Sequence, residues 1–410
     1  MVPNGWEVKH LSELASKVSD GIHKTPLYAE SSGVYFINGN NLKNGSIVIQ
    51  DSTNSVDEND AENHRKDLGE RTILMSINGT IGNLAYYRGE NVVLGKSAAY
   101  INVKNSVDLD FVYYVLSSSK TQAFYESELT GTTIRNLSIK SIKNTKVDTP
   151  PLPEQKKIAQ ILSTWDRAIS TTEQLLANSQ QQKKALMQQL LTGKKRLLDN
   201  NGVRFSGEWK KSTLGNLGNT FNGLTGKTKD DFGFGKKYIP YINIFKNSRI
   251  DLEALDLVDV KEGESQSLTQ FGDIFFTTSS ETPDEVGMSS VLLDQVDEVY
   301  LNSFCFGFRL FDFKSLLPEF ARYLLRSENI RSEIAVLGQG ATRYNLSKKQ
   351  LMKLELVLPN INEQKKIATI LSTADQEIAS LQQKLDTLKQ EKKALMQQLL
   401  TGKRRVKVNA

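Results

Sequence analysis

Side chains that could contact nucleic acid gather in one stretch near the N-terminus. Residues 20–45 read DGIHKTPLYAESSGVYFINGNNLKNG, and the glycines flank seven polar or basic candidates: His23, Lys24, Thr25, Asn38, Asn40, Asn41 and Lys43. Amide groups can pair with the edge of adenine, and cations can contact guanine or phosphate. The alternative is ordinary turn chemistry, because asparagine and glycine both tolerate unusual backbone angles. For each single residue this alternative stays open.

Motifs that would carry catalysis are incomplete. The segment GLTGKT at 223–228 is similar to a phosphate-binding loop, but Phe221 stands where that pattern needs its first glycine. The Pro-Pro pair at 150–151 lies in TPPL, which we interpret as a linker kink rather than an amino-methyltransferase motif. The three histidines, His10, His23 and His64, have no ligand partners at metal-binding spacing. The sequence therefore favours a non-catalytic chain without a metal site.

Two runs of basic residues have two interpretations. Lys194–Arg196 and Lys403–Arg405 each follow a long apolar pattern. Such runs can complement the negative end of a helix or contact phosphate, and both interpretations stay open. The pairs Lys156–Lys157 and Lys365–Lys366 are interpreted as a solvated helix face.

Composition excludes several classes of protein. The chain has 410 residues, 39% hydrophobic and 24% charged, as in ordinary globular proteins. One cysteine, Cys305, excludes an internal disulfide framework. The start MVPNGWEVKHL lacks the features of a secretory signal, and no apolar run reaches the length of a membrane span. We expect a cytoplasmic protein that does not enter a membrane. The net charge of +5 is compatible with nucleic acid but spread over the chain.

The chain is an internal duplication. Residues 154–196 align without gaps to residues 363–405, at an offset of 209, with 28 of 43 positions identical. The same offset pairs Gly131, Thr133 and Asn136–Ser138 with Gly340, Thr342 and Asn345–Ser347, whereas 20–130 and 222–339 have diverged. Such a long period excludes a solenoid and indicates two scaffolds with different surfaces.

Each repeated segment is predicted to be a long helix with an apolar seam. In the second copy the apolar residues alternate in steps of four and three, which is a heptad pattern. A helix this long needs a partner to bury its stripe, and the simplest partner is the other copy. Prolines 153 and 359 before the helices and glycines 193 and 402 near their ends fit helix boundaries. The predicted partner and coiled-coil residues are Ile158, Ile161, Trp165, Ile169, Leu176, Leu186, Leu190, Ile367, Ile370, Ala374, Ile378, Leu381, Leu385, Leu388, Leu395 and Leu399.

The diverged regions are predicted to be mixed α/β domains. Short apolar runs at 34–37, 46–49, 72–77 and 273–277 indicate strands, and 111–116 and 320–325 indicate helices. The polar segment 198–208 is interpreted as a linker. We therefore expect a first domain at 1–150, a helical region at 151–197, a linker and second domain at 198–358, and a second helical region at 359–410.

This arrangement resembles the specificity subunits of type I restriction-modification systems. The resemblance rests on the paired EQKKIAxIL...KKALMQQLLTGKxR helices, on DGIHKTP followed by FINGNNL, and on the segments GTTIRNLS and GATRYNLS. It covers the whole chain. The second domain departs from the first by having NGLTGKT and YINIFK instead.

The resemblance implies a fold and a function. The fold is an α/β (α+β) class with two target recognition domains, separated by two helices that form an antiparallel coiled coil with pseudo-two-fold symmetry. Each domain would read one half of a bipartite, asymmetric site in double-stranded DNA. The resemblance also adds five candidate DNA contacts: Arg135, Asn243, Lys246, Arg343 and Tyr344.

The resemblance assigns the chemistry to partners. Two modification subunits, which bind S-adenosylmethionine and methylate adenine, would dock on the helices. Restriction subunits that translocate with ATP and Mg would complete the enzyme, and this chain would hold no cofactor. The alternatives are a stand-alone DNA-binding regulator with a coiled-coil spacer, which would bind its site tightly alone, and a divergent methyltransferase or nuclease.

Overall fold

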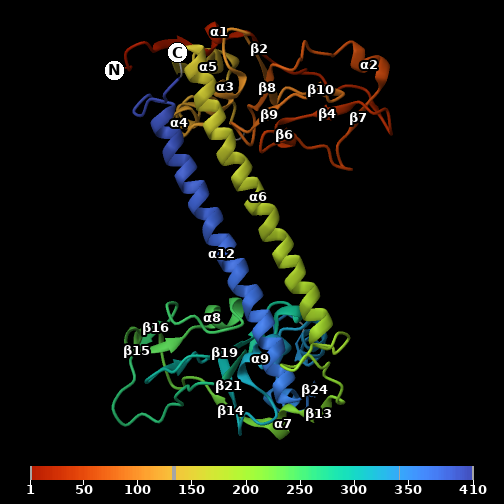
Figure 1. Cartoon of the computed structure of the whole chain (residues 1–410), viewed down its shortest axis with the longest axis vertical. Helices are drawn as coiled ribbons and strands as arrows, with labels where there is room; N and C mark the ends of the chain where they lie inside the picture. Colours follow the sequence, from red (N-terminus) through yellow and green to blue (C-terminus); the bar gives the residue numbers. More distant parts are fainter. Residues whose placement is uncertain (1, 132–134, 341, 409–410) are drawn as a thin grey trace. The chain divides into compact units, whose positions relative to one another are not determined.

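The structure, a computed structural model, describes residues 2–131, 135–340 and 342–408. The chain forms two compact units: unit 1 contains Met1–Glu173 and Gln383–Ala410, and unit 2 contains Gln174–Gln382 (Figure 1). Each unit holds one α/β domain, the beginning or end of helix α6 (Leu152–Leu190) and the opposite end of helix α12 (Ile361–Leu399). The termini of the chain therefore belong to the same unit.

The domain of unit 1 contains two main sheets. The first has the order β2-β11-β8-β9, with β2 Ala15–Asp20, β11 Ala98–Val103, β8 Thr72–Ser76 and β9 Leu84–Tyr86. The second has the order β10-β4-β7-β3, with β10 Val92–Leu94, β4 Tyr35–Ile37, β7 Ser55–Val56 and β3 Tyr28–Ala29. Smaller pairs join β1 (Glu7–His10) to β12 (Lys146–Thr149), and β5 (Leu42–Lys43) to β6 (Ser46–Ile47).

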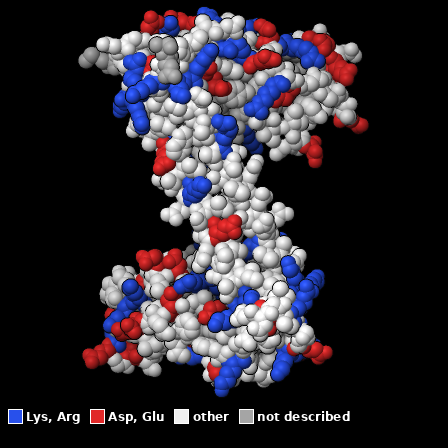
Figure 2. Space-filling view, viewed as in Figure 1, with Lys and Arg blue, Asp and Glu red and all other residues white. Residues whose placement is uncertain are grey.

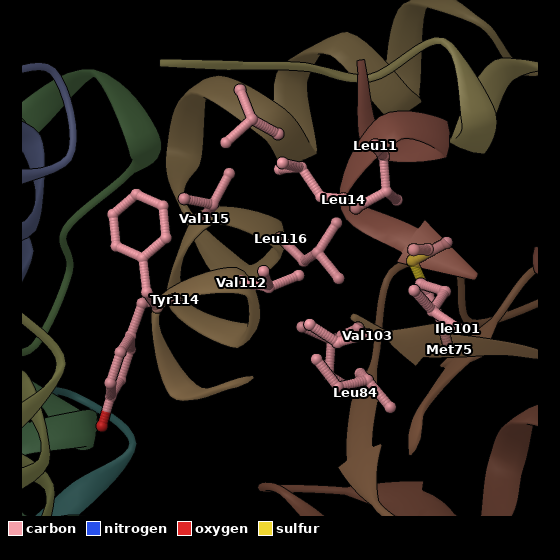
Figure 3. Packing of buried hydrophobic residues seen from close by; sticks show 14 of the residues in the cluster. Leu11, Leu14, Met75, Leu84, Ile101, Val103, Val112, Tyr114, Val115 and Leu116 are labelled. Atoms are coloured by element: carbon pink, nitrogen blue, oxygen red, sulfur yellow. The ribbon is translucent and has the colours of Figure 1, made fainter. Parts of the chain in front are cut away.

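Helices cover the first sheet and build the main core of unit 1. They are α1 Leu11–Leu14, α3 Leu109–Ser117, α4 Ser119–Ser127 and α5 Ile139–Lys143, while α2 Glu58–Glu62 lies elsewhere in the domain. Side chains of Asp108, Ser118 and Ser138 accept hydrogen bonds from backbone N–H groups in the first turns of α3, α4 and α5. In Figure 3 the apolar residues of α1, α3 and the sheet pack together, whereas the Tyr114 hydroxyl points away from them.

The domain of unit 2 repeats this plan. Its main sheet has the order β14-β21-β17-β19, with β14 Gly218–Asn222, β21 Cys305–Leu310, β17 Ile274–Thr277 and β19 Ser289–Val291. A second sheet joins β16 Asp256–Val258, β15 Phe232–Ile239 and β20 Tyr300–Leu301. A third joins β18 Ser279–Ser280, β23 Tyr344–Leu346 and β22 Gly338–Gln339, and β13 Lys210–Thr213 pairs with β24 Glu355–Leu358. The helices are α7 Leu214–Leu217, α8 Tyr241–Lys246, α9 Pro318–Leu324, α10 Glu328–Val336 and α11 Lys348–Leu351.

The two long helices pack against each other in antiparallel fashion within each unit. In unit 1, Lys389 near the end of α12 forms an ion pair of 2.8 Å with Glu173 of α6. In unit 2, Ser179 in the later half of α6 donates a hydrogen bond of 3.2 Å to Glu377 in the first half of α12. The fold prediction is confirmed, including the antiparallel pair of helices.

The predicted seam lies at this contact. All sixteen seam residues named from the sequence are buried or half-buried, and Ile158 and Ile367 also pack into the domain cores. Three polar residues, Thr172, Ser179 and Lys183, stand where the first heptad pattern would place apolar ones. Thr172 bonds its own helix, Ser179 bonds Glu377 and Lys183 pairs with Asp375. Within each unit the helices therefore bury an apolar stripe, as the heptad pattern requires.

The local predictions are largely confirmed. The four strand predictions fall on β4, β6, β8 and β17, and the two helix predictions fall on α3 and α9. One boundary was wrong, because Pro153 lies inside the first turn of α6, where a missing N–H leaves no helical hydrogen bond unmade. Gly193 and Gly402 have φ of 71° and 67°, the left-handed conformation that ends helices. No helix in the described part of the chain is long and apolar enough to cross a membrane.

Candidate nucleic-acid interface

Five segments meet at one edge of the domain in unit 1. Four backbone hydrogen bonds tie them together: Ile22 to Leu94 at 2.7 Å, Gly95 to Ile37 at 2.8 Å, and Ile77 to Ser97 and Leu137 to Ile77 at 2.9 Å, each written donor first. We call these segments, residues 21–25, 38–43, 77–83, 95–97 and 135–137, loop cluster 1. All eight of the candidates predicted in the first domain lie in it, although they come from three separate parts of the sequence.

Asn38 and Asn41 hold the backbone of loop cluster 1. The Asn41 side chain accepts from the Asn38 N–H at 2.9 Å and donates to the Val48 carbonyl at 3.0 Å. The Asn38 side chain accepts from the Ser97 hydroxyl at 2.8 Å. For these two residues the turn-chemistry interpretation is the one that the contacts support.

Asn40 and Lys43 are available to a ligand. Both side chains are exposed and have no hydrogen-bond partner among the described residues. They line a hollow of about 220 Å³ whose other walls include the exposed polar residues Gln50, Ser52 and Asn54. One loop therefore contains two asparagines that build it and one that faces outward.

The remaining candidates of unit 1 are exposed. His23 bonds Asp20 at 2.8 Å, whereas Lys24 and Thr25 extend into solvent. Arg135 forms an ion pair with Glu126, and both side chains are 62% exposed. Such an exposed pair contributes little stability, so the Arg135 guanidinium can exchange partners at low cost. Residues 132–134 of the segment GTTIRNLS lie outside the described residues.

Unit 2 contains an equivalent cluster. Leu224 donates to Leu301 at 2.8 Å, Asn302 to Ile239 at 3.1 Å, Thr278 to Phe304 at 3.0 Å and Leu346 to Thr278 at 2.8 Å. These four backbone bonds correspond one by one to those of loop cluster 1. We call residues 223–228, 241–246, 278–287, 302–304 and 343–346 loop cluster 2. The two domains thus build the same edge from different sequences.

Asn243 was wrongly predicted as a surface contact. It is 2% exposed and its amide donates to the carbonyls of Asp251 and Ala254 at 2.8 and 2.9 Å. Its side-chain oxygen accepts from the Asp251 N–H at 3.0 Å. The residue closes the loop after α8 from inside, which satisfies buried polar groups.

The other candidates of unit 2 are accessible. Lys246 and Arg343 are exposed and Tyr344 is half-buried. Tyr344 pairs with Ser280 in the small sheet of β18 and β23. Ala341, in the segment GATRYNLS, lies outside the described residues.

The segment 223–228 does not have the geometry of a phosphate-binding loop. The Lys227 side chain is 4% exposed and pairs with Glu264 at 2.5 Å. A three-residue turn, Lys229–Asp231, follows it, rather than a helix that could point several N–H groups at a phosphate. The segment is therefore a glycine-containing loop rather than a phosphate-binding one, in agreement with its incomplete motif.

The basic runs have a role that sequence reasoning missed. Arg196 binds both carboxylate oxygens of Glu363 at 2.6 and 2.7 Å, and Arg405 binds Glu154 at 2.7 and 2.8 Å. Each pair joins the segment after one long helix to the buried start of the other. The arginines stack over Trp209 and Trp6, at 5.8 and 5.7 Å from the ring centres. The offset of 209 shows that Glu154 and Arg196 recur as Glu363 and Arg405, but not that each arginine binds the glutamate of the other copy.

A second set of contacts fastens each domain to the helices. Tyr114 of α3 donates to Asp166 at 2.6 Å, and Lys392 pairs with the same carboxylate. In unit 2, Tyr323 of α9 donates to Asp375 at 2.7 Å, and Lys183 pairs with it. Burial, together with the adjacent carboxylate, raises the pKa of both tyrosine hydroxyls, so they remain donors.

Charge alone does not mark the interface. In Figure 2 basic and acidic side chains are interspersed on the visible face of both units. No group of three or more histidine, cysteine, aspartate or glutamate side chains that could hold a metal occurs within 2–131, 135–340 and 342–408.

Comparisons with known proteins agree with this architecture. The family model described as the type I restriction modification DNA specificity domain matches residues 3–178 and again 206–390. The type I restriction enzyme MjaVIII specificity subunit of Methanocaldococcus jannaschii is 25% identical, over 99% of this chain and 94% of that relative.

Two solved structures share the fold. The S subunit of a type I restriction-modification system from M. genitalium has a TM-score of 0.57 at 18% identity, with 98% of each chain covered. The HsdS subunit from Thermoanaerobacter tengcongensis has a TM-score of 0.51 at 17% identity, again with 98% of each chain covered. Because the family model matches both repeats and most of the chain, this protein belongs to the type I restriction modification DNA specificity family and is a specificity subunit of that class.

Proposed function

We propose that each loop cluster reads one half of a bipartite, asymmetric target in double-stranded DNA. The observation that carries this proposal is the equivalence of the two clusters, which share four backbone hydrogen bonds but differ in their outward side chains. A common scaffold presents two sets of reading groups. Because base contacts carry the sequence information, different side chains on equivalent loops specify different half-sites.

We propose further that the ends of the long helices dock two modification subunits. Of positions 154–164, ten of eleven match 363–373, and of positions 183–196, thirteen of fourteen match 392–405, whereas only five of eighteen between them match. Exposed positions share this identity, including Lys184, Gln188 and Lys194 with Lys393, Gln397 and Lys403. Packing does not require identical exposed residues, so two identical partners explain them better.

Each unit has a groove that fits this role. The groove of unit 2 has a volume of about 870 Å³ and that of unit 1 about 300 Å³. Both are lined by the same five positions of the repeat and by the serine that precedes α10 or α4. These residues are Lys183, Lys184, Met187, Gln188, Thr192 and Ser327 in unit 2, and Lys392, Lys393, Met396, Gln397, Thr401 and Ser118 in unit 1.

In this proposal the chain is a non-catalytic reader. S-adenosylmethionine would be bound by the modification subunits, and ATP and Mg by the restriction subunits of the full complex. The target adenine must leave the base stack to be methylated, and the modification subunit would bind the extruded base. We assign the complex to the cytoplasm, where bacterial and archaeal DNA lies.

The test is a domain exchange. Residues 209–358 are replaced by the matching domain of a related specificity subunit, which retains both long helices and the first domain. The chimera, expressed with its modification subunits, should methylate a site in which one half is new and the other half is unchanged. Genome-wide mapping of methylated adenine measures this. If both halves change together, or neither changes, the two-reader proposal is wrong.

A further inference from the structure

Phe304 in loop cluster 2 is an exposed aromatic residue on a rigid turn. It lies between β20 and β21, and 64% of its surface is exposed. Its N–H donates to the Asn302 side chain at 2.8 Å, and its carbonyl accepts from Thr278 at 3.0 Å. These bonds fix the backbone at Phe304, and its ring makes no aromatic or cation–π contact within the described residues.

The equivalent position in unit 1 is polar and satisfied. Ser97 occupies it, because Ile77 bonds its carbonyl as Thr278 bonds that of Phe304. The Ser97 hydroxyl donates to Asn38 at 2.8 Å and accepts from the Gly39 N–H at 2.9 Å. The fold of this edge therefore does not need an aromatic ring at this position. Exposed apolar side chains are common on this protein, so the position of Phe304 within loop cluster 2, rather than its exposure, is what links it to DNA.

The surroundings of Phe304 suit DNA. Tyr241 of α8 donates to the Ser279 carbonyl at 3.1 Å, one residue from the partner of Phe304. Arg343 is exposed and precedes Tyr344, which pairs with Ser280 in the small sheet. Ser280 lies two residues after Thr278, the partner of Phe304. A phenylalanine flanked by a cation matches the way in which DNA-binding proteins insert apolar side chains between base pairs while cations hold the phosphates.

We propose that Phe304 is an apolar wedge that inserts at a base step in the half-site read by loop cluster 2. The proposal rests on the proposed function. The two half-sites are then recognised by different means: hydrogen bonds and charge in loop cluster 1, and base stacking with local deformation in loop cluster 2. Specificity at the wedged step comes from the energy of unstacking it, which depends on the sequence of that step.

The experiment uses the intact chain in complex with its modification subunits. The probe is a duplex of the mapped methylation target with 2-aminopurine, whose fluorescence rises on unstacking, at each position of the second half-site in turn. The variants are Phe304→Ala and Phe304→Leu. Phe311→Ala is the matched control, because Phe311 is 63% exposed and lies at the opposite end of β21, outside loop cluster 2.

The complex should raise the fluorescence at the flipped adenine, in wild type and variants alike, and the wild-type complex should also raise it at one further step, which is the wedged one. Phe304→Ala should abolish the rise at the wedged step and weaken binding roughly tenfold, Phe304→Leu should retain part of both effects, and Phe311→Ala should change neither. All variants should unfold at the wild-type temperature, since the ring is exposed. If Phe304→Ala binds as tightly as the wild type, or binds less tightly with an unchanged fluorescence pattern, the wedge is refuted. A wild-type complex that binds no sequence specifically would instead refute the proposed function.

Discussion

The contacts that join each domain to the long helices, which we call the junctions, are more alike in the two units than the loop clusters are. At the junctions the two copies keep the same residues in the same contacts: arginine on glutamate, and tyrosine and lysine on aspartate. At the loop clusters they keep the same backbone hydrogen bonds but change the side chains. The difference indicates that the two junctions have the same structural role, whereas the two loop clusters have different binding properties.

The junctions are not identical in every respect. The Trp6 indole N–H donates to Glu154 at 3.1 Å, whereas that of Trp209 is buried without a partner among the described residues. The Arg196 side chain is 20% exposed and that of Arg405 is 44% exposed. Arg196 in unit 2 is therefore less hydrated than Arg405 in unit 1, so its charge depends more on pairing with Glu363.

The largest expected effect comes from breaking the ion pair between Arg196 and Glu363. Glu363→Ala leaves Arg196 largely buried and unpaired, so it should lower the free energy of unfolding of unit 2 by about 3 kcal/mol. Glu154→Ala should cost less, because water can reach Arg405. Urea unfolding followed by tryptophan fluorescence measures both, with the exposed Glu355→Ala as control. Equal losses in the two variants would mean that burial does not distinguish the junctions.

The next effect concerns base reading by loop cluster 1. Asn40→Ala removes an outward amide and should weaken binding of the methylation target by about 2 kcal/mol without changing the unfolding temperature. Titration of the complex with labelled target DNA measures the affinity. Asn105→Ala, an exposed asparagine outside the cluster, should leave it unchanged. Unaltered binding by Asn40→Ala would return this residue to simple turn chemistry.

Its neighbour should behave in the opposite way. Asn41→Ala removes two hydrogen bonds to the backbone and should lower the stability of the domain in unit 1 by about 1 to 2 kcal/mol. Thermal unfolding checks this. A variant that unfolds at the wild-type temperature would show that these bonds do not hold the loop.

The smallest effect concerns one phosphate contact. Lys43→Ala should weaken binding to all sequences alike and reduce the slope of log affinity against log salt concentration by about 1. Affinities at several salt concentrations measure the slope, with the exposed Lys143→Ala as control. An unchanged slope would exclude Lys43 from the phosphate contacts.

Much of the architecture could be predicted from periodic patterns. The heptad seam of residues such as Leu385 and Leu399 predicted the antiparallel helix pair, because a long amphipathic helix must bury its stripe. The offset of 209 predicted two domains of the same plan. The heptad pattern can be read from one sequence because it depends on residue spacing along one helix. The repeat can be read because its two copies retain identical residues.

The candidate site was predictable only as a region. The sequence does not separate the roles of Asn38, Asn40 and Asn41, and Asn243 is of a residue type that commonly makes surface contacts. Which amide faces solvent depends on whether a carbonyl such as that of Val48 or Asp251 lies within reach.

The sequence by itself determined the duplication, which is visible as repeated residues, and the helix pair, which follows from the spacing of apolar residues. Only the tertiary structure decided that Glu154 and Glu363 bind the arginines at the far ends of the other helices, 251 and 167 residues away along the chain. It alone also placed Phe304 in the position that Ser97 holds in the first domain. Such contacts form only in the folded chain, because folding brings together residues that lie far apart in the sequence and share no local pattern.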